Sequence, residues 1–141
     1  LNDLREWLGT DALRYSLARY PADSPLTLDP ELLRKRTNDN PVFYVQYANA
    51  RVNSILRKAR EAGVAVDDAT LAAAHLAHLG HEAELQVIRK LGEWPRLVEI
   101  AAKGNEPHRV AFYLYELASD FHGLWNKGNE DDSLRFLQED T

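Results

Sequence analysis

Residues 40–58 constrain the fold more than any other segment, because they carry the pattern of one long amphipathic helix. Asn40 is suited to cap the first turn, and Pro41 fits the first helical position, where its missing N–H costs nothing. Apolar side chains then recur at helical spacing, which predicts a stripe that faces a core. This stripe comprises Val42, Val45, Ala48 or Asn49, Val52 and Ile55.

A second stripe on the same helix combines aromatic rings with cations: Tyr44, Tyr47, Arg51, Ser54 and Lys58. Rings that can stack on bases, followed by cations that can hold phosphates, are what a surface for nucleic acid needs. The alternative interpretation is that the tyrosines are half-buried packing residues and that the cations form a solvated face.

The rest of the chain is helical in pattern, and no segment shows the sustained alternation of a strand. Gly, Pro, Asn and Asp residues separate the predicted helices, which are 3–8, 11–19, 30–36, 41–62, 68–79, 81–91, 94–102, 107–127 and 133–139. We therefore predict an all-α helical bundle. A chain of 141 residues with 45% hydrophobic content can bury one core, so we expect one domain over residues 1–141.

Composition excludes several classes of protein. No apolar run approaches the ~18 residues of a membrane span. The chain has no cysteine, which removes disulfides, thiol catalysis and cysteine-based zinc sites, and which fits a cytoplasmic protein. The net charge is −5, which argues against a simple electrostatic binder of DNA or RNA.

The charge is unevenly distributed, and this leaves room for a local RNA contact. Residues 34–60 hold seven cations and one anion, a balance of +6, so the remainder of the chain sums to −11. An acidic body with one basic segment permits RNA binding if the contact is confined to that segment.

Metal binding and catalysis have little support. His75, His78 and His81 lie close in sequence, but Gly80 interrupts the helix that the first two would share. No nucleophile and base pair, phosphate-binding glycine loop or paired-carboxylate site is recognisable. We expect no metal, no cofactor and no catalytic residue in this chain.

Four segments, in order along the chain, resemble one family. They are the tetrapeptide Asp11-Ala12-Leu13-Arg14, the link 22–41, residues 40–51, which read NPVFYVQYANAR, and residues 107–118, which read PHRVAFYLYELA. Together they resemble bacterial arginyl-tRNA synthetases, in the C-terminal anticodon-binding domain called DALR after the tetrapeptide. The resemblance implies a bundle of the class I aminoacyl-tRNA synthetase anticodon-binding type. It also implies a partner, the anticodon stem-loop of arginine tRNA.

That resemblance gives the aromatic and basic side chains their expected roles. All arginine codons have a central G, so a site for arginine anticodons has to read a central C. Cytosine offers two acceptors that Arg51 can serve and one donor that Gln46 or a backbone carbonyl can accept. Stacking platforms are expected from Tyr44 and Tyr47, and from Phe121 with Trp125 near the end of the second long helix. Phosphate contacts are expected among Lys58, Arg57, Arg34 and Lys35.

Three further expectations concern the larger protein. The chain has no Met and begins with Leu1, so we expect an excised piece of a larger protein. The resemblance implies that the catalytic domain precedes it and that a last helix is missing from its C-terminal end. The parent enzyme would use ATP with magnesium to attach arginine to its tRNA, while this piece would have no activity of its own. In the tetrapeptide, we expect a buried Arg14 paired with a carboxylate, where the bundle meets the catalytic domain. The alternative function is a helical protein–protein interaction domain without RNA binding, which would use residues 68–91 and 94–102.

Overall fold

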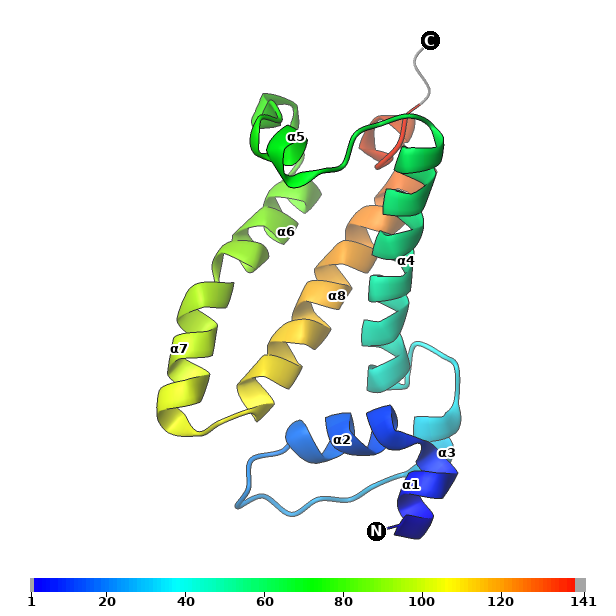
Figure 1. The fold of residues 1–141 in the computed structure, drawn as a ribbon. Coiled ribbons are helices and arrows are strands. Elements are labelled where there is room, and N and C mark those ends of the chain that lie inside the picture. The colour runs from blue at the N-terminus through cyan, green and yellow to red at the C-terminus, as the bar shows by residue number, and fades with distance from the viewer. Residues whose placement is uncertain (1, 139–141) are drawn as a thin grey trace.

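Two long helices organise the molecule: α4 (Pro41–Glu61) and α8 (His108–Glu130), which pack against each other (Figure 1). A computed structural model describes residues 2–138, and its described elements are all helical. The prediction of an all-α bundle is therefore confirmed. Within residues 2–138, no helix is long and apolar enough to cross a membrane.

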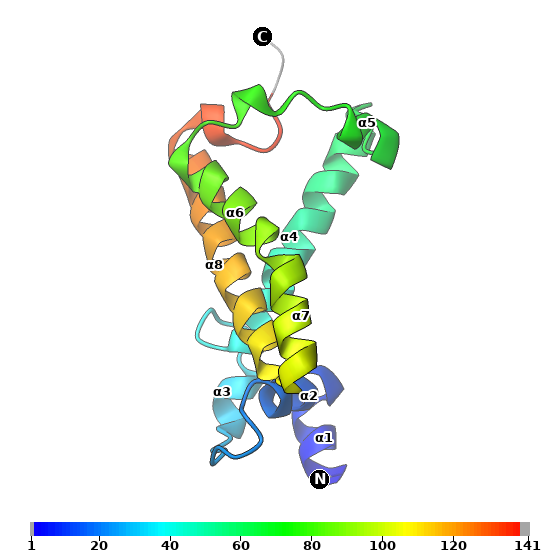
Figure 2. The same cartoon turned by 90° about the vertical axis from the view of Figure 1, so that its left-hand side faces the viewer.

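Three short helices form the base of the molecule, beneath the lower ends of α4 and α8 (Figures 1 and 2). They are α1 (Asn2–Leu8), α2 (Thr10–Ala18) and α3 (Pro30–Arg34). One apolar cluster joins them to the first turn of α4 through Leu8, Ala12, Leu33 and Val42. The hydroxyl of Tyr15 also donates to the carbonyl of Ala111 at 3.1 Å, which fixes α2 against α8.

The far side of α8 is covered by α6 (Glu82–Gly92) and α7 (Trp94–Gly104), which follow each other in nearly one line (Figure 1). Pro95 lies in the first turn of α7 and cannot donate a backbone hydrogen bond, so the helix is interrupted at Glu93. Tyr113 of α8 anchors the pair, because its hydroxyl donates to the carbonyl of Lys90 at 2.9 Å and its ring lies 5.3 Å from that of Trp94.

Two predicted helices are shorter than expected. The predicted helix 68–79 is observed as α5 (Asp68–Ala72) and a separate 3₁₀ turn, Leu76–His78. The predicted helix 133–139 is a 3₁₀ turn at Asp132–Leu134, and residue 139 lies outside the described residues. Neither segment buries a side chain within these turns, so they lack the packing that stabilises short helices in water.

The predicted break at Gly128 is also wrong, since α8 continues to Glu130. Gly128 is buried, and a Cβ at this position would lie only 3.0 Å from the carbonyl oxygen of Leu134. Because glycine has no Cβ, the chain after α8 can fold back across the helix at Gly128, but the helix does not end at this residue.

The core side of α4 includes most of the predicted stripe. Val42 and Ala48 are buried as expected, but Val52 is 39% exposed. Val45 and Ile55 pack on the cluster of Ala48, Ala118 and Phe121, and so does Tyr44. One member of the stripe assigned to nucleic acid, Tyr44, thus lies at the helix–helix contact.

Asn40 joins α3 to α4, and we expect its replacement by alanine to destabilise the fold by about 3 kcal/mol. Its side-chain oxygen accepts from the amide of Val42 at 3.1 Å, and its Nδ2 donates to the carbonyls of Leu33 and Lys35 at 2.9 and 2.8 Å. Alanine would leave all of these groups unpaired at a position that is 4% exposed. Urea denaturation measures the loss, with Asn38→Ala in the same loop as the control, because Asn38 is exposed.

Candidate nucleic-acid interface

Four side chains from α4 and α8 form a continuous row on one surface of the bundle. Phe43 and Tyr47 stack with ring centroids 5.6 Å apart at an interplanar angle of 16°. The guanidinium carbon of Arg51 then lies 4.2 Å from the centroid of Tyr47 and 4.6 Å from that of Trp125. We call Phe43, Tyr47, Arg51 and Trp125 the aromatic row. The three members from α4 are spaced four residues apart, so helix geometry places them above one another.

Arg51 is held by hydrogen bonds as well as by rings. Its Nη2 donates to the hydroxyl of Tyr47 at 3.0 Å, and its Nη1 lies 2.9 Å from Nδ1 of His122. Since a guanidinium can only donate, Nδ1 of His122 is the acceptor and Nε2 carries the ring hydrogen. That Nε2–H donates to the carbonyl of Tyr44 at 3.2 Å. The row is therefore tied to the α4–α8 contact by His122, which is 6% exposed.

Two of the predicted stacking residues lie in or against the core instead of on this surface. Tyr44 is half-buried, and its ring lies 5.1 Å from that of Tyr115 and 4.6 Å from that of His122. Phe121 is 8% exposed and belongs to the cluster between α4 and α8. Phe121 is therefore buried between the helices, and the ring of Tyr44 is engaged with other rings of the protein.

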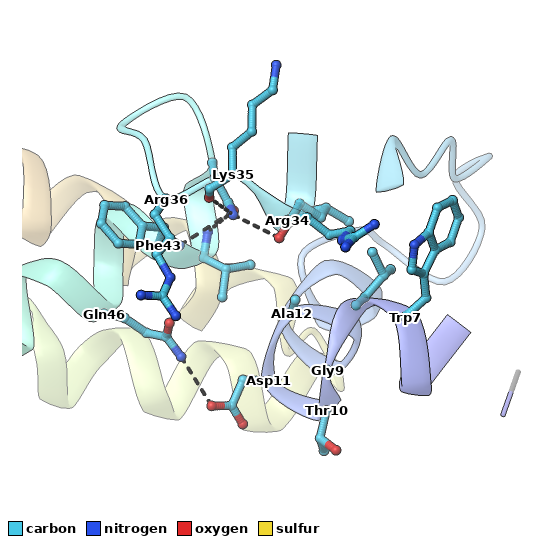
Figure 3. Close-up of a pocket in the computed structure, with 14 residues that line it drawn as sticks. Trp7, Gly9, Thr10, Asp11, Ala12, Arg34, Lys35, Arg36, Phe43 and Gln46 are labelled. Atoms are coloured by element: carbon cyan, nitrogen blue, oxygen red, sulfur yellow. Dashed lines mark hydrogen bonds between the residues drawn. The ribbon is translucent and has the colours of Figure 1, made fainter. Parts of the chain in front are cut away.

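Gln46 faces a different part of the surface, a pocket of about 580 Å³ between the base and α4 (Figure 3). Its Nε2 donates to Oδ2 of Asp11 at 3.1 Å, and the structure does not bring it together with Arg51. Phe43 lines the same pocket, so the pocket adjoins one end of the aromatic row. The same pocket is also lined by three basic residues, Arg34, Lys35 and Arg36.

The cations of this pocket differ in how they are held. Arg34 lies over the ring of Trp7, with its guanidinium carbon 5.7 Å from the ring centroid. Lys35 extends away from the other labelled residues (Figure 3). Arg14, for which we expected a buried pair where the bundle meets the catalytic domain, is exposed within this chain. The tetrapeptide supports the fold through its buried members Ala12 and Leu13 instead.

The opposite end of the row borders a second pocket, of about 210 Å³, which is lined in part by Trp125, Lys58, Arg135 and Phe136. Lys58 is exposed, while Arg135 pairs with Asp132 at 2.7 Å. The aromatic row thus has basic side chains at both ends. From residue 43 to residue 58, α4 spans about 22 Å at 1.5 Å per residue.

Sequence reasoning missed three residues of this surface. Phe43 extends the row at four residues before Tyr47, and that spacing alone could have identified it. His122 and Arg135 lie far from α4 in sequence, and no local pattern marks them as neighbours of Arg51 or Lys58. Tyr47, Arg51, Trp125 and Lys58 were selected from the sequence, and the structure brings them to one face.

Within residues 2–138, no group of three or more His, Cys, Asp or Glu side chains is arranged to hold a metal ion. The rings of His75 and His78 lie 5.7 Å apart. His81 instead caps α6, because its Nδ1 accepts from the amide of Ala83 at 3.0 Å.

The environment of His122 predicts a pH-dependent stability. Burial lowers the pKa of His122, the hydrogen bond to Tyr44 opposes this shift, and the charge of Arg51 lowers the pKa further. The unfolded chain therefore binds a proton more readily than the folded chain. This contribution to stability is complete above the ordinary histidine pKa of about 6.5 and is lost as the pH falls from there towards the lower pKa of the folded state.

The measurement is the free energy of unfolding between about pH 7.5 and about pH 5.5, a range above the ordinary pKa values of carboxyl groups. The wild type should lose stability on acidification, and His122→Asn should lose less. His75→Gln is the control, since His75 is exposed, and it should follow the wild type. Equal slopes for His122→Asn and the wild type would contradict the prediction.

Comparison with known proteins identifies the family. The profile of the DALR anticodon binding domain matches residues 45–140, which is most of the chain and includes nearly all of α4 and all of α8. The chain belongs to the DALR anticodon-binding domain family.

Relatives of this DALR domain are much longer proteins. It is 60% identical over 140 residues to an arginine–tRNA ligase from Cereibacter sphaeroides and 57% identical over 139 residues to one from Ruegeria pomeroyi. Each match covers 99% of this chain but 24% of the relative. The DALR domain thus spans about a quarter of the length of the curated relatives that it matches.

A solved structure supports the same assignment. A crystal structure described as an arginyl-tRNA synthetase from Campylobacter jejuni superimposes with a TM-score of 0.76 at 29% identity, over 94% of this chain and 29% of that one. The predicted resemblance to the DALR domain of arginyl-tRNA synthetases is confirmed. A protein-interaction domain without RNA binding, the alternative function, is not favoured.

Proposed function

We propose that this DALR domain binds the anticodon stem-loop of arginine tRNA along the aromatic row. The observation that supports this most directly is the position of Arg51, a cation held between the rings of Tyr47 and Trp125 on the surface of an anticodon-binding domain. Base stacking on exposed aromatic side chains is tolerant of sequence, whereas hydrogen bonds from a fixed cation can select a base.

The central C of the anticodon is the base that we assign to Arg51. Among the described contacts, Arg51 uses one N–H of Nη1 and one of Nη2. Each of these nitrogens carries two hydrogens, so a second N–H on each remains to donate to O2 and N3 of cytosine. Tyr47 and Trp125 would then stack on neighbouring bases, and Phe43 would extend the platform. Tyr44, Phe121 and Gln46 are omitted from this surface because of their positions in the structure.

Phosphate contacts would lie at the two ends of the row. Lys58 and Arg57 are exposed on the C-terminal half of α4, and Arg34 and Lys35 line the pocket beside Phe43. These groups would neutralise the backbone that enters and leaves the anticodon loop, which makes binding dependent on salt.

The relatives support a proposal for the activity of the whole protein. An arginine–tRNA ligase joins arginine to tRNA at the expense of ATP, bound with magnesium, and we assign this activity to the same protein outside the DALR domain. The DALR domain would read the tRNA without catalysing a reaction and would act together with the catalytic domain of the same chain. This role in translation would place the protein in the cytoplasm.

The test compares two stem-loops that differ in one base. We expect the domain to bind the arginine anticodon stem-loop about tenfold or more tightly than the loop in which the central C is replaced by U, because U presents a donor at N3 where C presents an acceptor. Equal affinity for both loops would contradict the reading of the central C. A slope of log K against log salt then counts the phosphates that are held.

A further inference from the structure

Arg51 would be mobile if only solvent surrounded it, because a free arginine side chain has many rotamers. The structure restrains it on three sides. The guanidinium carbon lies over the rings of Tyr47 and Trp125, 4.2 and 4.6 Å from their centroids. Nδ1 of His122, 2.9 Å from Nη1, fixes the rotation of the guanidinium within its own plane.

His122 can serve as this acceptor in only one of its forms. The carbonyl of Tyr44 accepts from Nε2, so the ring hydrogen of the neutral imidazole is fixed there and Nδ1 keeps its lone pair towards Arg51. A doubly protonated ring would direct an N–H at the guanidinium, and two donors with like charge would face each other at hydrogen-bond distance.

We propose that His122 is a positioning residue for RNA binding, which in its neutral form holds Arg51 between Tyr47 and Trp125 and on protonation releases it. The inference rests on the proposed function, since it concerns the same surface. It adds that the affinity for the anticodon loop depends on the protonation of a buried ring on the other long helix.

Arg51 is the charged side chain that the imidazole of His122 contacts, so protonation of His122 would act directly on Arg51. From α4, the imidazole faces Arg51 and the rings of Tyr44 and Tyr47, whose centroids lie 4.6 and 5.5 Å away. On α8 itself, its ring neighbour is Phe121 at 5.8 Å.

Several polar groups on the other elements that pack on α8 have partners of their own, and Arg19, which follows α2, lies over the rings of Phe112 and Tyr115. Lys90 of α6 pairs with Glu93 and Glu116, at 2.9 and 3.0 Å. Arg135, beside the last 3₁₀ turn, pairs with Asp132 at 2.7 Å. From α2, the phenol of Tyr15 donates to Ala111 at 3.1 Å.

Two variants of His122 separate positioning from packing. In His122→Asn, the amide oxygen takes the place of Nδ1, so the acceptor for Arg51 is retained but cannot be protonated. In His122→Phe, a ring of similar size is retained and the acceptor is lost. Binding of the arginine anticodon stem-loop is measured at about pH 7.5 and at about pH 5.0, well below the ordinary histidine pKa, because burial and the charge of Arg51 lower the pKa of His122 in the folded protein. Circular dichroism verifies that each variant is folded, and Arg51→Ala is the reference for loss of the cation.

We expect the wild type to bind about tenfold more weakly at the lower pH, because one hydrogen bond to a charged group is lost. His122→Asn should bind with equal affinity at both pH values, and His122→Phe about tenfold more weakly than the wild type at the higher pH. If His122 were merely structural, binding by the wild type would not weaken at the lower pH, and His122→Asn would not abolish such a pH dependence. If His122→Phe does not fold, the comparison of His122→Asn with the wild type decides alone.

Failure of the inference can be told from failure of the proposed function. If the wild type does not bind the stem-loop at about pH 7.5, or if Arg51→Ala binds as tightly as the wild type, the proposed surface is wrong and the inference falls with it. If Arg51→Ala abolishes binding but His122→Asn keeps the pH dependence of the wild type, only the role of His122 is overturned.

Discussion

Replacing Tyr47 with alanine is expected to weaken binding of the arginine anticodon stem-loop by about 10- to 100-fold, since each base stacked on an aromatic side chain contributes roughly 1–3 kcal/mol. Two effects combine at this position. The exposed part of the ring is lost as a platform, and Arg51 loses both the ring beneath it and the hydroxyl at 3.0 Å. Fluorescence anisotropy with a labelled stem-loop measures the change in Kd.

Two control variants make this result specific. Tyr20→Ala removes a tyrosine of nearly equal exposure, 39% against 37% for Tyr47, from a segment outside the aromatic row, and should bind as the wild type does. Tyr47→Phe keeps the ring and loses only the hydroxyl, so its affinity should lie between those of the wild type and Tyr47→Ala. A loss of the same size in Tyr20→Ala would show that the effect is not confined to the row.

Replacing Phe121 with alanine is expected to reduce the free energy of unfolding by about 3–5 kcal/mol, which is the usual cost of deleting a buried phenylalanine ring. Phe121 is 8% exposed and packs with Ala48 and Ala118, the small residues that let α4 approach α8. Domains of this size are stable by only about 5–15 kcal/mol, so the variant should unfold at much lower denaturant concentration.

The matched control is Phe112→Ala, because Phe112 lies on the same helix and is 44% exposed. It should cost less than about 1 kcal/mol. A second variant, Phe121→Leu, tests the earlier assignment of Phe121 to base stacking. It keeps an apolar side chain in the core, so a folded Phe121→Leu should bind the stem-loop with the affinity of the wild type. A folded Phe121→Leu that had lost RNA binding would instead support the assignment of Phe121 to base stacking.

Local chemistry made the helices predictable. Asn40 and Pro41 mark the start of α4, and Gly63 takes a positive φ of 81° just after its end. These signals depend on the few residues around each helix end and need no tertiary contact. The wrong predictions concern positions where tertiary packing determines the structure. At Gly128, for example, the segment around Leu134 occupies the space that a side chain would fill.

Periodicity could not fix which flank of α4 meets α8. Two stripes of α4 are compatible with a core. The one that contains Val45 carries aliphatic side chains at helical spacing, and the one that contains Tyr44 begins with aromatic rings. The structure packs Tyr44 as well as Val45 on the cluster between α4 and α8, and it exposes Val52. The ring of Tyr44 lies against Tyr115 and His122, so the core side is broader than one stripe.

The candidate surface was predictable only in the part that one helix supplies. Tyr47, Arg51 and Lys58 follow from the pattern of α4. The acceptor for Arg51 lies 71 residues further along the chain, and a histidine in the middle of a helix carries no sign of the contact it makes. The resemblance of α8 to its family suggested Trp125, whereas the role of His122 required the structure.

The hydrogen bonds of Asn40 have a mechanical consequence. A single side chain connects the end of α3 to the first amide groups of α4, so the two segments cannot rotate independently about the loop between them. A torque exerted on α4 by a bound RNA loop would therefore pass to α3, and through the apolar cluster of the base to α1 and α2. Asn40 therefore couples the orientation of the base to that of the aromatic row.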